Sequence, residues 1–158
     1  MYFHKLTAAA PQPDFRLLVH FNDGQAKLYD MKPLFSQYPV FQALQDTPGL
    51  FEQVSIDPGG YGISWNDDLD LSADELFAGG RSISTPFEGL LSLADAAALW
   101  DLDESTLRKA ISCRRLVNGT DVKKYGKQWL ITRAAMEREY GPLEAESASQ
   151  PAAVRKSV

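Results

Sequence analysis

Cationic side chains are the most concentrated chemical feature of this sequence, and they gather in one stretch. Between Ser105 and Arg133 there are eight Lys and Arg residues and a single acid, Asp121, which gives a local net charge of +7. A dense row of cations suits DNA, because phosphate contacts dominate non-specific DNA affinity. The alternative is a solvated helix face, which is what most runs of charge are.

The residues around these cations have the spacing of two short helices joined by a turn. Ser92–Asp95 has a capping-box pattern, which predicts the start of the first helix. Asp103 is a favourable cap for a second helix after a turn of about three residues. Two such helices form a helix-turn-helix, an architecture that reads the DNA major groove. The inward side of the second helix is expected to carry Leu107, Ala110 and Ile111.

The outward side of the second helix carries hydroxyl, guanidinium and ammonium groups. The residues expected to approach base edges are Ser105, Thr106, Arg108, Lys109 and Ser112. A wing is predicted next, with its turn at Asn118–Gly119 and a return strand at 129–131, before a third helix capped by Thr132. The residues expected to contact phosphates are Arg115, Lys123, Lys124 and Lys127. Because one recognition helix covers few base pairs, we expect a homodimer or tandem sites.

The winged helix-turn-helix of excisionases and MerR-type regulators resembles two parts of this sequence. They are residues 91–111 (LSLADAAALWDLDESTLRKAI) and 126–132 (GKQWLIT). The resemblance implies that the second helix enters the major groove and that the wing meets the backbone or the minor groove. Two positions depart from the family pattern, since Asp101 replaces a turn glycine and Arg114 replaces a glycine that commonly follows the recognition helix. The predicted wing, residues 116–129, is also longer than usual.

The first half of the chain has the alternation expected of strands. Asn22–Gln25 has the composition of a hairpin turn between two alternating runs. Pro39 is expected to kink or break a helical stretch, and Ser72 is expected to cap a short last helix. The predicted order of elements is ββαββα, with strands at 15–21, 26–31, 54–56 and 63–65 and helices at 33–44 and 73–77.

Charge and composition divide the chain into modules. Residues 1–80 hold four basic and eleven acidic side chains, a net charge of −7, whereas residues 81–141 have a net charge of +2. Such asymmetry suggests two domains with different partners. The predicted class is α+β, with a small N-terminal domain followed by a mainly α winged helix-turn-helix domain and a disordered tail. The predicted boundaries are 1–80 for the acidic domain, 81–90 for a linker, 91–142 for the DNA-binding domain and 143–158 for the tail.

The first module resembles the bacterial family known as domain of unknown function 2442. The likeness rests on DFRLLVHFNDG at 14–24, YD at 29–30, LF at 50–51 and WNDDLDL at 65–71. Members of that family are often found beside small toxin-like genes, and some carry a DNA-binding domain. The resemblance specifies a fold better than it specifies an activity.

An acidic cluster follows the second predicted hairpin. A metal site is one interpretation, but the spacing and the glycine of an EF-hand are missing, and no metal is expected. The other interpretations are a docking surface for a basic partner, such as a toxin, and plain solubilising charge near a turn and a helix start. The residues of the cluster are Asp67, Asp68, Asp70, Asp74 and Glu75.

Several function classes find no support in the sequence. The single cysteine, Cys113, rules out an internal disulfide and suits a reducing cytoplasm. No apolar run approaches the roughly 20 residues that span a bilayer, so no membrane partner is expected. No Ser/His/Asp set, phosphate loop or pair of carboxylates in an apolar context emerges, so we expect neither an enzyme nor a cofactor.

These patterns together predict a cytoplasmic, sequence-specific binder of double-stranded DNA. The expected class is a bacterial transcriptional regulator of antitoxin-like or mobile-element type that represses its own operon. The alternative is an inhibitor or adaptor, such as an antitoxin or a phage counter-defence protein, that acts mainly through protein contacts.

Overall fold

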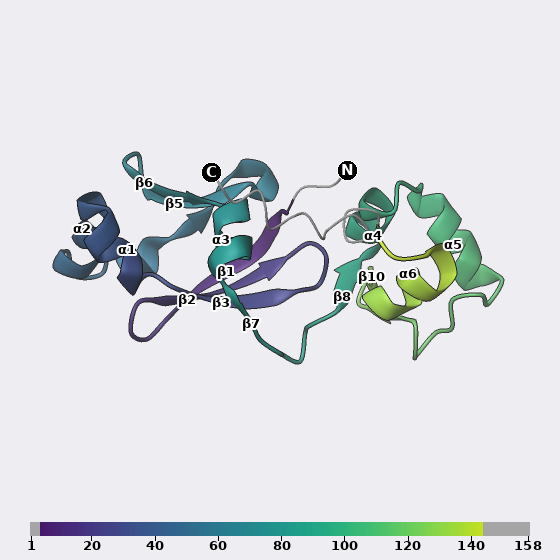
Figure 1. Cartoon of the computed structure of the whole chain (residues 1–158). Coiled ribbons are helices and arrows are strands. Elements are labelled where there is room, and N and C mark those ends of the chain that lie inside the picture. Colours follow the sequence, from purple (N-terminus) through teal and green to yellow (C-terminus); the bar gives the residue numbers. More distant parts are fainter. Residues whose placement is uncertain (1–3, 144–158) are drawn as a thin grey trace. The chain divides into compact units, whose positions relative to one another are not determined.

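The computed structural model describes residues 4–143 and has the predicted α+β class (Figure 1). Within that range the chain divides into two compact units, residues 4–88 and 89–143, and each has its own hydrophobic core. The predicted disordered tail lies outside the described residues except for Leu143, which is buried in the second unit.

The first sheet of the N-terminal unit is antiparallel, with the strand order β1-β2-β3-β7. Its strands are β1 (Leu6–Gln12), β2 (Arg16–Phe21), β3 (Ala26–Asp30) and β7 (Arg81–Ser82). The predicted alternation of β2 is confirmed, since Leu17, Val19 and Phe21 are all buried. The Asp23 carboxylate holds the following hairpin turn by accepting the backbone N–H of Gln25 at 3.1 Å.

Two strands of this sheet, β1 and β7, add to the predicted ββαββα order. The edge strand β1 is rich in alanine and contains Pro11. Alanine is depleted in strands and proline is confined to sheet edges, so this segment lacks the sequence pattern of a strand. The two-residue strand β7 lies in the predicted linker, 81–90, and pairs with Lys27 and Leu28. Its formation depends on this distant pairing and not on a local pattern.

The helical stretch predicted over 33–44 is broken at Pro39, as expected. Tyr38 is extended, with φ −134° and ψ 98°, because a residue before proline disfavours the helical region. The resulting pieces are α1 (Lys32–Gln37), η1 (Pro39–Phe41) and α2 (Gln42–Asp46), and η2 (Phe51–Gln53) follows.

A second antiparallel sheet, of order β4-β5-β6, and helix α3 complete the N-terminal unit. Ser72 caps α3 as predicted, and its hydroxyl accepts the N–H of Glu75 at 3.0 Å. The strand β6 is a further element that the predicted ββαββα order lacks, and it contains Asp70 of the acidic cluster. The side-chain oxygen of Asn66 accepts the N–H groups of Asp68 and Leu69, which closes a tight turn and returns the chain as a strand. The elements are β4 (Ser55–Ile56), η3 (Pro58–Gly60), β5 (Gly62–Asn66), β6 (Leu69–Ser72) and α3 (Ala73–Gly79).

The C-terminal unit packs three helices around a three-stranded sheet of order β8-β10-β9. Leu107, Ile131 and Met136 lie at its centre and are fully buried. The indole N–H of Trp100 donates to the carbonyl of Gly141 at 2.7 Å, which connects the ends of the first and last helices. The elements are β8 (Leu90–Ser92), α4 (Leu93–Leu99), α5 (Glu104–Ser112), β9 (Val122–Tyr125), β10 (Gln128–Thr132) and α6 (Arg133–Tyr140).

Two of the three predicted helix caps in this unit are confirmed by side-chain hydrogen bonds. Ser92 accepts the N–H of Asp95 at 3.0 Å, and Thr132 accepts the N–H of Ala135 at 3.1 Å. Asp103 occupies the cap position of α5, but its carboxylate accepts no cap hydrogen bond within residues 4–143.

The wing turns at a different place from the one predicted. Strands β9 and β10 form its hairpin, and the turn lies at Gly126–Lys127, where Gly126 has φ 61°. The predicted turn, Asn118–Gly119, belongs to a separate loop before β9. That loop closes when the Asp121 carboxylate accepts the N–H of Val117 at 2.8 Å. The long wing predicted over 116–129 is therefore a loop followed by a short hairpin.

Candidate DNA-binding surface

The turn between α4 and α5 and the turn after α5 share one geometry. Each helix ends in a Schellman motif, in which the residue after the C-cap is left-handed. These residues are Asp101, with φ 57°, and Arg114, with φ 67°. They are the two positions at which the resemblance noted in the sequence leads one to expect glycine, and the left-handed turns form here without it. The closing hydrogen bonds run from Leu102 N–H to Ala97 O at 2.8 Å and from Arg115 N–H to Ala110 O at 2.9 Å.

Helix α5 buries Leu107 and Ala110 and exposes its polar side. All nine residues predicted to contact DNA are exposed, both the five on α5 and the four after it. Successive helical residues rotate by about 100°, which gathers four of the side chains into one outward strip with Thr106 at its edge. The four are Ser105, Arg108, Lys109 and Ser112.

Two charged residues of the cationic stretch do not belong to this surface. The side chain of Arg133 is only 14% exposed and pairs with Glu137 at 3.0 Å. Asp121 is buried, and its carboxylate accepts hydrogen bonds from both terminal nitrogens of Arg138, at 2.8 and 3.0 Å. These bonds from Arg138, with the bond from Val117, hold the pKa of Asp121 below its usual value. The acid of the stretch is therefore neutralised inside the fold, and seven exposed cations remain.

Two of the seven cations have acidic neighbours. Arg108 lies 3.6 Å from Glu104 one turn earlier on α5, and Arg115 lies 3.5 Å from Glu139 on α6. Exposed pairs of this kind contribute about 0–1 kcal/mol, so a phosphate can replace the carboxylate at little cost. In the part of the chain that the structure describes, no ion pair engages Lys109, Arg114, Lys123, Lys124 or Lys127.

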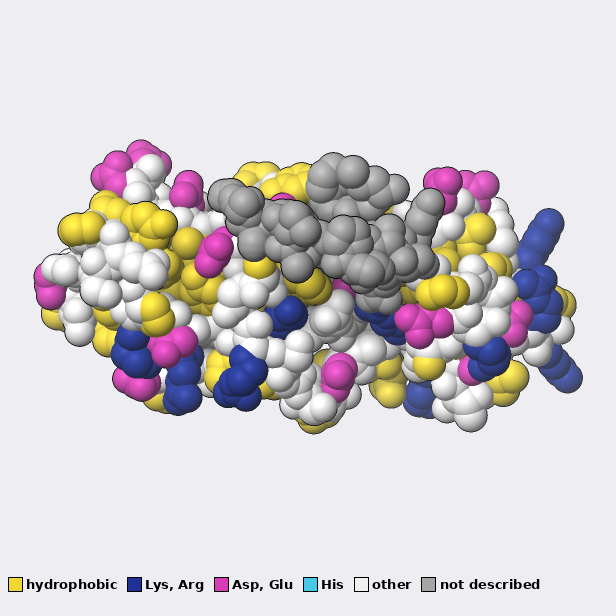
Figure 2. Space-filling model, viewed as in Figure 1, with side chains coloured by type: hydrophobic (Ala, Val, Ile, Leu, Met, Phe, Trp, Pro, Cys, Tyr) yellow, Lys and Arg dark blue, Asp and Glu magenta, His cyan; other side chains and the backbone are white. Residues whose placement is uncertain are grey.

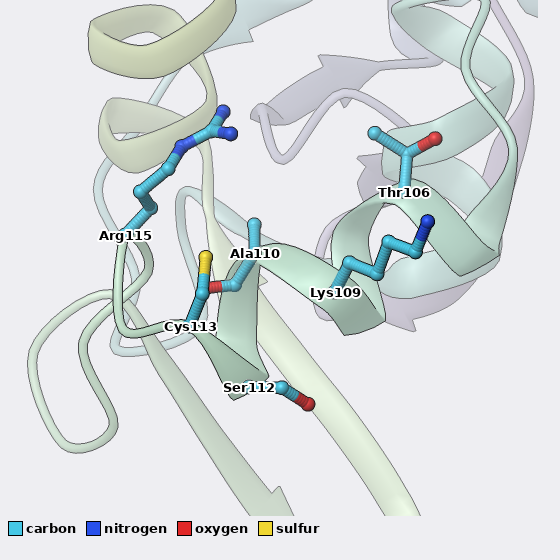
Figure 3. A pocket seen from close by; sticks show the side chains of 6 residues that line it. All are labelled: Thr106, Lys109, Ala110, Ser112, Cys113 and Arg115. Carbon is cyan, nitrogen blue, oxygen red and sulfur yellow. The ribbon is translucent and has the colours of Figure 1, made fainter.

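An open depression lies beside α5, and it is lined by Thr106, Lys109 and Arg115 among others. Figure 3 shows these three side chains rising on the same side of the chain, whereas the side chain of Ser112 points away. Figure 2 shows Lys and Arg side chains projecting from the side of the unit on which Figure 1 draws α5. A hydroxyl and two cations on one side suit an anionic backbone better than an apolar small molecule.

The wing carries cations on both of its faces. Lys124 is in register with Trp129, and its ammonium lies 5.7 Å from the centre of that ring. Lys123 lies on the opposite face, because neighbouring strand residues alternate, and its ammonium is 5.7 Å from the ring of Tyr125. Lys127 is at the tip of the hairpin. The wing therefore exposes cations on both of its faces and at its tip.

Two of the exposed side chains in this region that are not among the nine predicted residues could contact DNA. Arg114 follows α5 directly, and the run of charge that predicted Arg115 contains it too. Tyr125, near the tip of the wing, is 58% exposed. Its sequence context gave no signal, because an aromatic residue in a strand is more often part of a packed face.

The acidic cluster of the N-terminal unit does not converge on one point. Three of its members are exposed on the β5–β6 hairpin, where Figure 2 shows acidic side chains at the turn. Glu75 instead accepts a hydrogen bond from the Tyr29 hydroxyl at 2.8 Å, and Asp74 lies 3.2 Å from the ring nitrogen of His4. Within residues 4–143, no group of three or more His, Cys, Asp or Glu side chains is arranged to hold a metal ion.

Comparison with known families supports this division into two modules. Residues 83–145 match a family described as "Helix-turn-helix domain". The C-terminal unit is a helix-turn-helix domain. Residues 6–82 match a family described as "Protein of unknown function (DUF2442)". The two-module resemblance inferred from the sequence is thereby confirmed.

The helix-turn-helix domain indicates DNA binding, since this motif places its second helix in the major groove. Searches of curated proteins and of solved structures gave no match to the chain. Among residues 4–143, no helix is both long enough and apolar enough to cross a membrane.

Proposed function

We propose that this protein is a sequence-specific DNA-binding regulator that represses its own operon, of the antitoxin-like or mobile-element type. The observation that carries the proposal is the surface of the helix-turn-helix domain. Seven exposed cations lie on the polar strip of α5, directly after α5 and on the wing, and the one acid of that stretch is buried in a pair with Arg138. The match of residues 6–82 to the DUF2442 family supports the antitoxin-like assignment, because members of the family it resembles are often found beside toxin-like genes.

The residues of this surface divide into two roles. The strip on α5 would read base edges, and Arg108 can donate two hydrogen bonds to a guanine once it leaves Glu104. The wing lysines would contact phosphates, which position the protein without reading sequence. A useful affinity calls for a homodimer or tandem operators, because one recognition helix covers few base pairs. The role is regulatory and cytoplasmic rather than enzymatic, in keeping with a single cysteine and a sequence without a catalytic set.

Arg108→Ala and Lys124→Ala separate these two roles. We expect Arg108→Ala to reduce the preference for the operator over random DNA by about 1–3 kcal/mol, because a bidentate base contact is lost. We expect Lys124→Ala to weaken binding to both DNAs equally. It should also reduce the slope of log affinity against log salt by about one. Lys5→Ala, which removes a cation from the N-terminal unit, is the matched control.

The measurement is a gel-shift or anisotropy titration on duplex DNA from upstream of the gene, between about 50 and 200 mM salt. Binding that is tighter on this DNA than on random DNA, and weaker at higher salt, supports the proposal. Absence of salt-sensitive binding by the wild-type protein would end it.

Protein binding by the N-terminal unit is a second candidate function, as an antitoxin or adaptor. The specific observation is an open depression lined by Tyr38, Phe41 and the carboxylates of Asp70 and Glu75. Tyr38 is 55% exposed and its neighbour Val40 is 52% exposed. Exposed apolar side chains beside carboxylates suit an apolar protein segment that carries Lys or Arg.

Capture of a partner by tagged full-length protein in its native host tests this second function. We expect a Tyr38→Ser, Asp70→Asn double variant to lose the partner while Lys124→Ala retains it, because only the former changes the depression. A circular dichroism spectrum checks that the double variant is folded. Retention by the folded double variant, or loss in Lys124→Ala, places the contact elsewhere.

A further inference from the structure

Arg114 occupies a backbone conformation that favours glycine. Its φ of 67° is left-handed, and it is the residue after the C-cap in the Schellman motif that ends α5. L-residues with a Cβ are strained there by about 1–2 kcal/mol relative to glycine, and asparagine and aspartate are tolerated best. The equivalent residue after α4 is Asp101, with φ 57°. Arginine, unlike aspartate, is not favoured by a left-handed backbone, so the local conformation does not explain Arg114.

The side chain of Arg114 is free to meet a ligand. It is exposed, and within residues 4–143 no ion pair engages it. Arg115, which is also predicted to contact phosphates, lies 3.5 Å from Glu139, so unlike Arg114 it must leave a carboxylate to meet a phosphate. The backbone N–H of Arg115 closes the Schellman motif on Ala110, so Arg114 is fixed directly beyond the last turn of α5.

We propose that Arg114 is a phosphate anchor of the DNA-binding surface, and that its side chain is kept at this position at a cost in stability. A guanidinium offers two parallel N–H donors to a phosphate, a geometry that a glycine at this site would forgo. This inference rests on the proposed DNA-binding function. Glycine at position 114 would suit the turn better than arginine does, but it would bind DNA more weakly.

Three variants separate the charge of Arg114 from its backbone strain. Arg114→Gly removes both, and we expect a higher melting temperature together with about tenfold weaker DNA binding and a salt slope reduced by about one. Arg114→Gln removes only the charge, so we expect the same loss of affinity and slope with little change in melting temperature. Asp101→Gly changes the equivalent position after α4 without removing a cation, and aspartate is already tolerated there, so we expect a smaller gain in melting temperature than for Arg114→Gly and no loss of affinity.

The experiment uses full-length protein, duplex DNA from upstream of the gene and random duplex DNA at several salt concentrations, with thermal denaturation in parallel. If wild-type protein shows no salt-sensitive binding, the proposed function itself fails. If wild-type protein binds but Arg114→Gln keeps the wild-type affinity and slope, the anchor is refuted while DNA binding stands. A lower melting temperature for Arg114→Gly would refute the cost in stability, because relief of strain at φ 67° must stabilise the turn.

Discussion

The Asp121 carboxylate is the one acid in the cationic stretch, but its burial removes its charge from the surface. In the sequence it is the acid that interrupts a row of cations, yet it is buried and accepts two hydrogen bonds from Arg138 and one from the N–H of Val117. The pairing fixes the loop before the wing to α6. The same side chain therefore leaves the surface more positive and holds the base of the wing in place.

Acid should weaken the C-terminal unit through this residue. The pKa of Asp121 is lowered in the folded state, chiefly by the bonds from Arg138, so its stabilising contribution is present above the unfolded value of about 3.9. That contribution is lost as pH falls through the lower, folded pKa. We expect Asp121→Asn to cost about 1–2 kcal/mol at neutral pH, because charged hydrogen bonds are lost.

The measurement for Asp121 is the free energy of unfolding of the C-terminal unit by urea, followed from neutral pH to about pH 3. We expect the wild-type curve to fall more steeply below about pH 4 than the curve of Asp121→Asn. Parallel curves would show that the pair contributes nothing to the pH dependence. Asp46→Asn, in the N-terminal unit, is a matched removal of an exposed acid.

At the scale of the element, two of the three helix caps in the C-terminal unit accept a backbone N–H with their side chains, and one does not. Ser92→Ala and Thr132→Ala each remove a hydroxyl that accepts a backbone N–H, so each should lower the free energy of unfolding by about 1 kcal/mol. Asp103→Ala should cost only about 0.3 kcal/mol, since its carboxylate makes no cap bond within the described residues and only its charge near the helix start is lost. Urea unfolding of the three variants provides the comparison. An Asp103→Ala loss as large as the other two would show that its side chain does cap α5 in solution.

Elements with strong local signals were predictable from the sequence. The three helices of the C-terminal unit follow from their caps and apolar spacing, and the break at Pro39 follows from proline chemistry. The missed strands, β1, β6, β7 and β8, are an alanine-rich edge, a short return after an Asn66 turn, and two strands of two and three residues. Each depends on a partner strand, which local periodicity does not report.

The wing was misplaced for a similar reason. Asn118–Gly119 is a strong turn signal, but the turn it makes is closed by Asp121, which Arg138 holds from a distant helix. The nine predicted contact residues are all exposed, because rotation along a helix and alternation along a strand are local properties. The ion pair of Arg115 with Glu139 was not predictable, because it joins α5's end to α6, whereas Glu104 and Arg108 have the i,i+4 spacing of a local helical pair. The left-handed backbone of Arg114 was not predicted either, although this position departs from a pattern that has glycine.

At the scale of the whole molecule, the two units carry opposite charge. Residues 4–88 have a net charge of −7 and residues 89–143 a net charge of +2. Each unit has its own core, so a fragment of residues 89–145 should fold alone. We expect that fragment to bind random DNA more tightly than the full chain at low salt, because the acidic unit repels phosphates. The difference should shrink once the Debye length falls to about 8 Å near physiological salt.

Anisotropy titrations of the fragment and the full chain at two salt concentrations make this comparison. The N-terminal fragment added in trans is the control, since it supplies the acidic unit without the covalent connection. Tighter binding by the full chain at every salt concentration would show that the N-terminal unit adds to DNA affinity, for example by dimerisation, instead of opposing it.

The three tryptophans are distributed so that each unit has its own optical signal. Trp65 belongs to the N-terminal core, where its indole N–H donates to the carbonyl of Phe51 at 3.0 Å, while Trp100 and Trp129 belong to the C-terminal unit. In a Trp65→Phe protein, tryptophan fluorescence would arise from the DNA-binding unit alone. A phosphate that draws the Lys124 ammonium away from the Trp129 ring would change the emission of that ring. The contact between these two residues is thus an unlabelled fluorescent sensor of whether the wing is occupied.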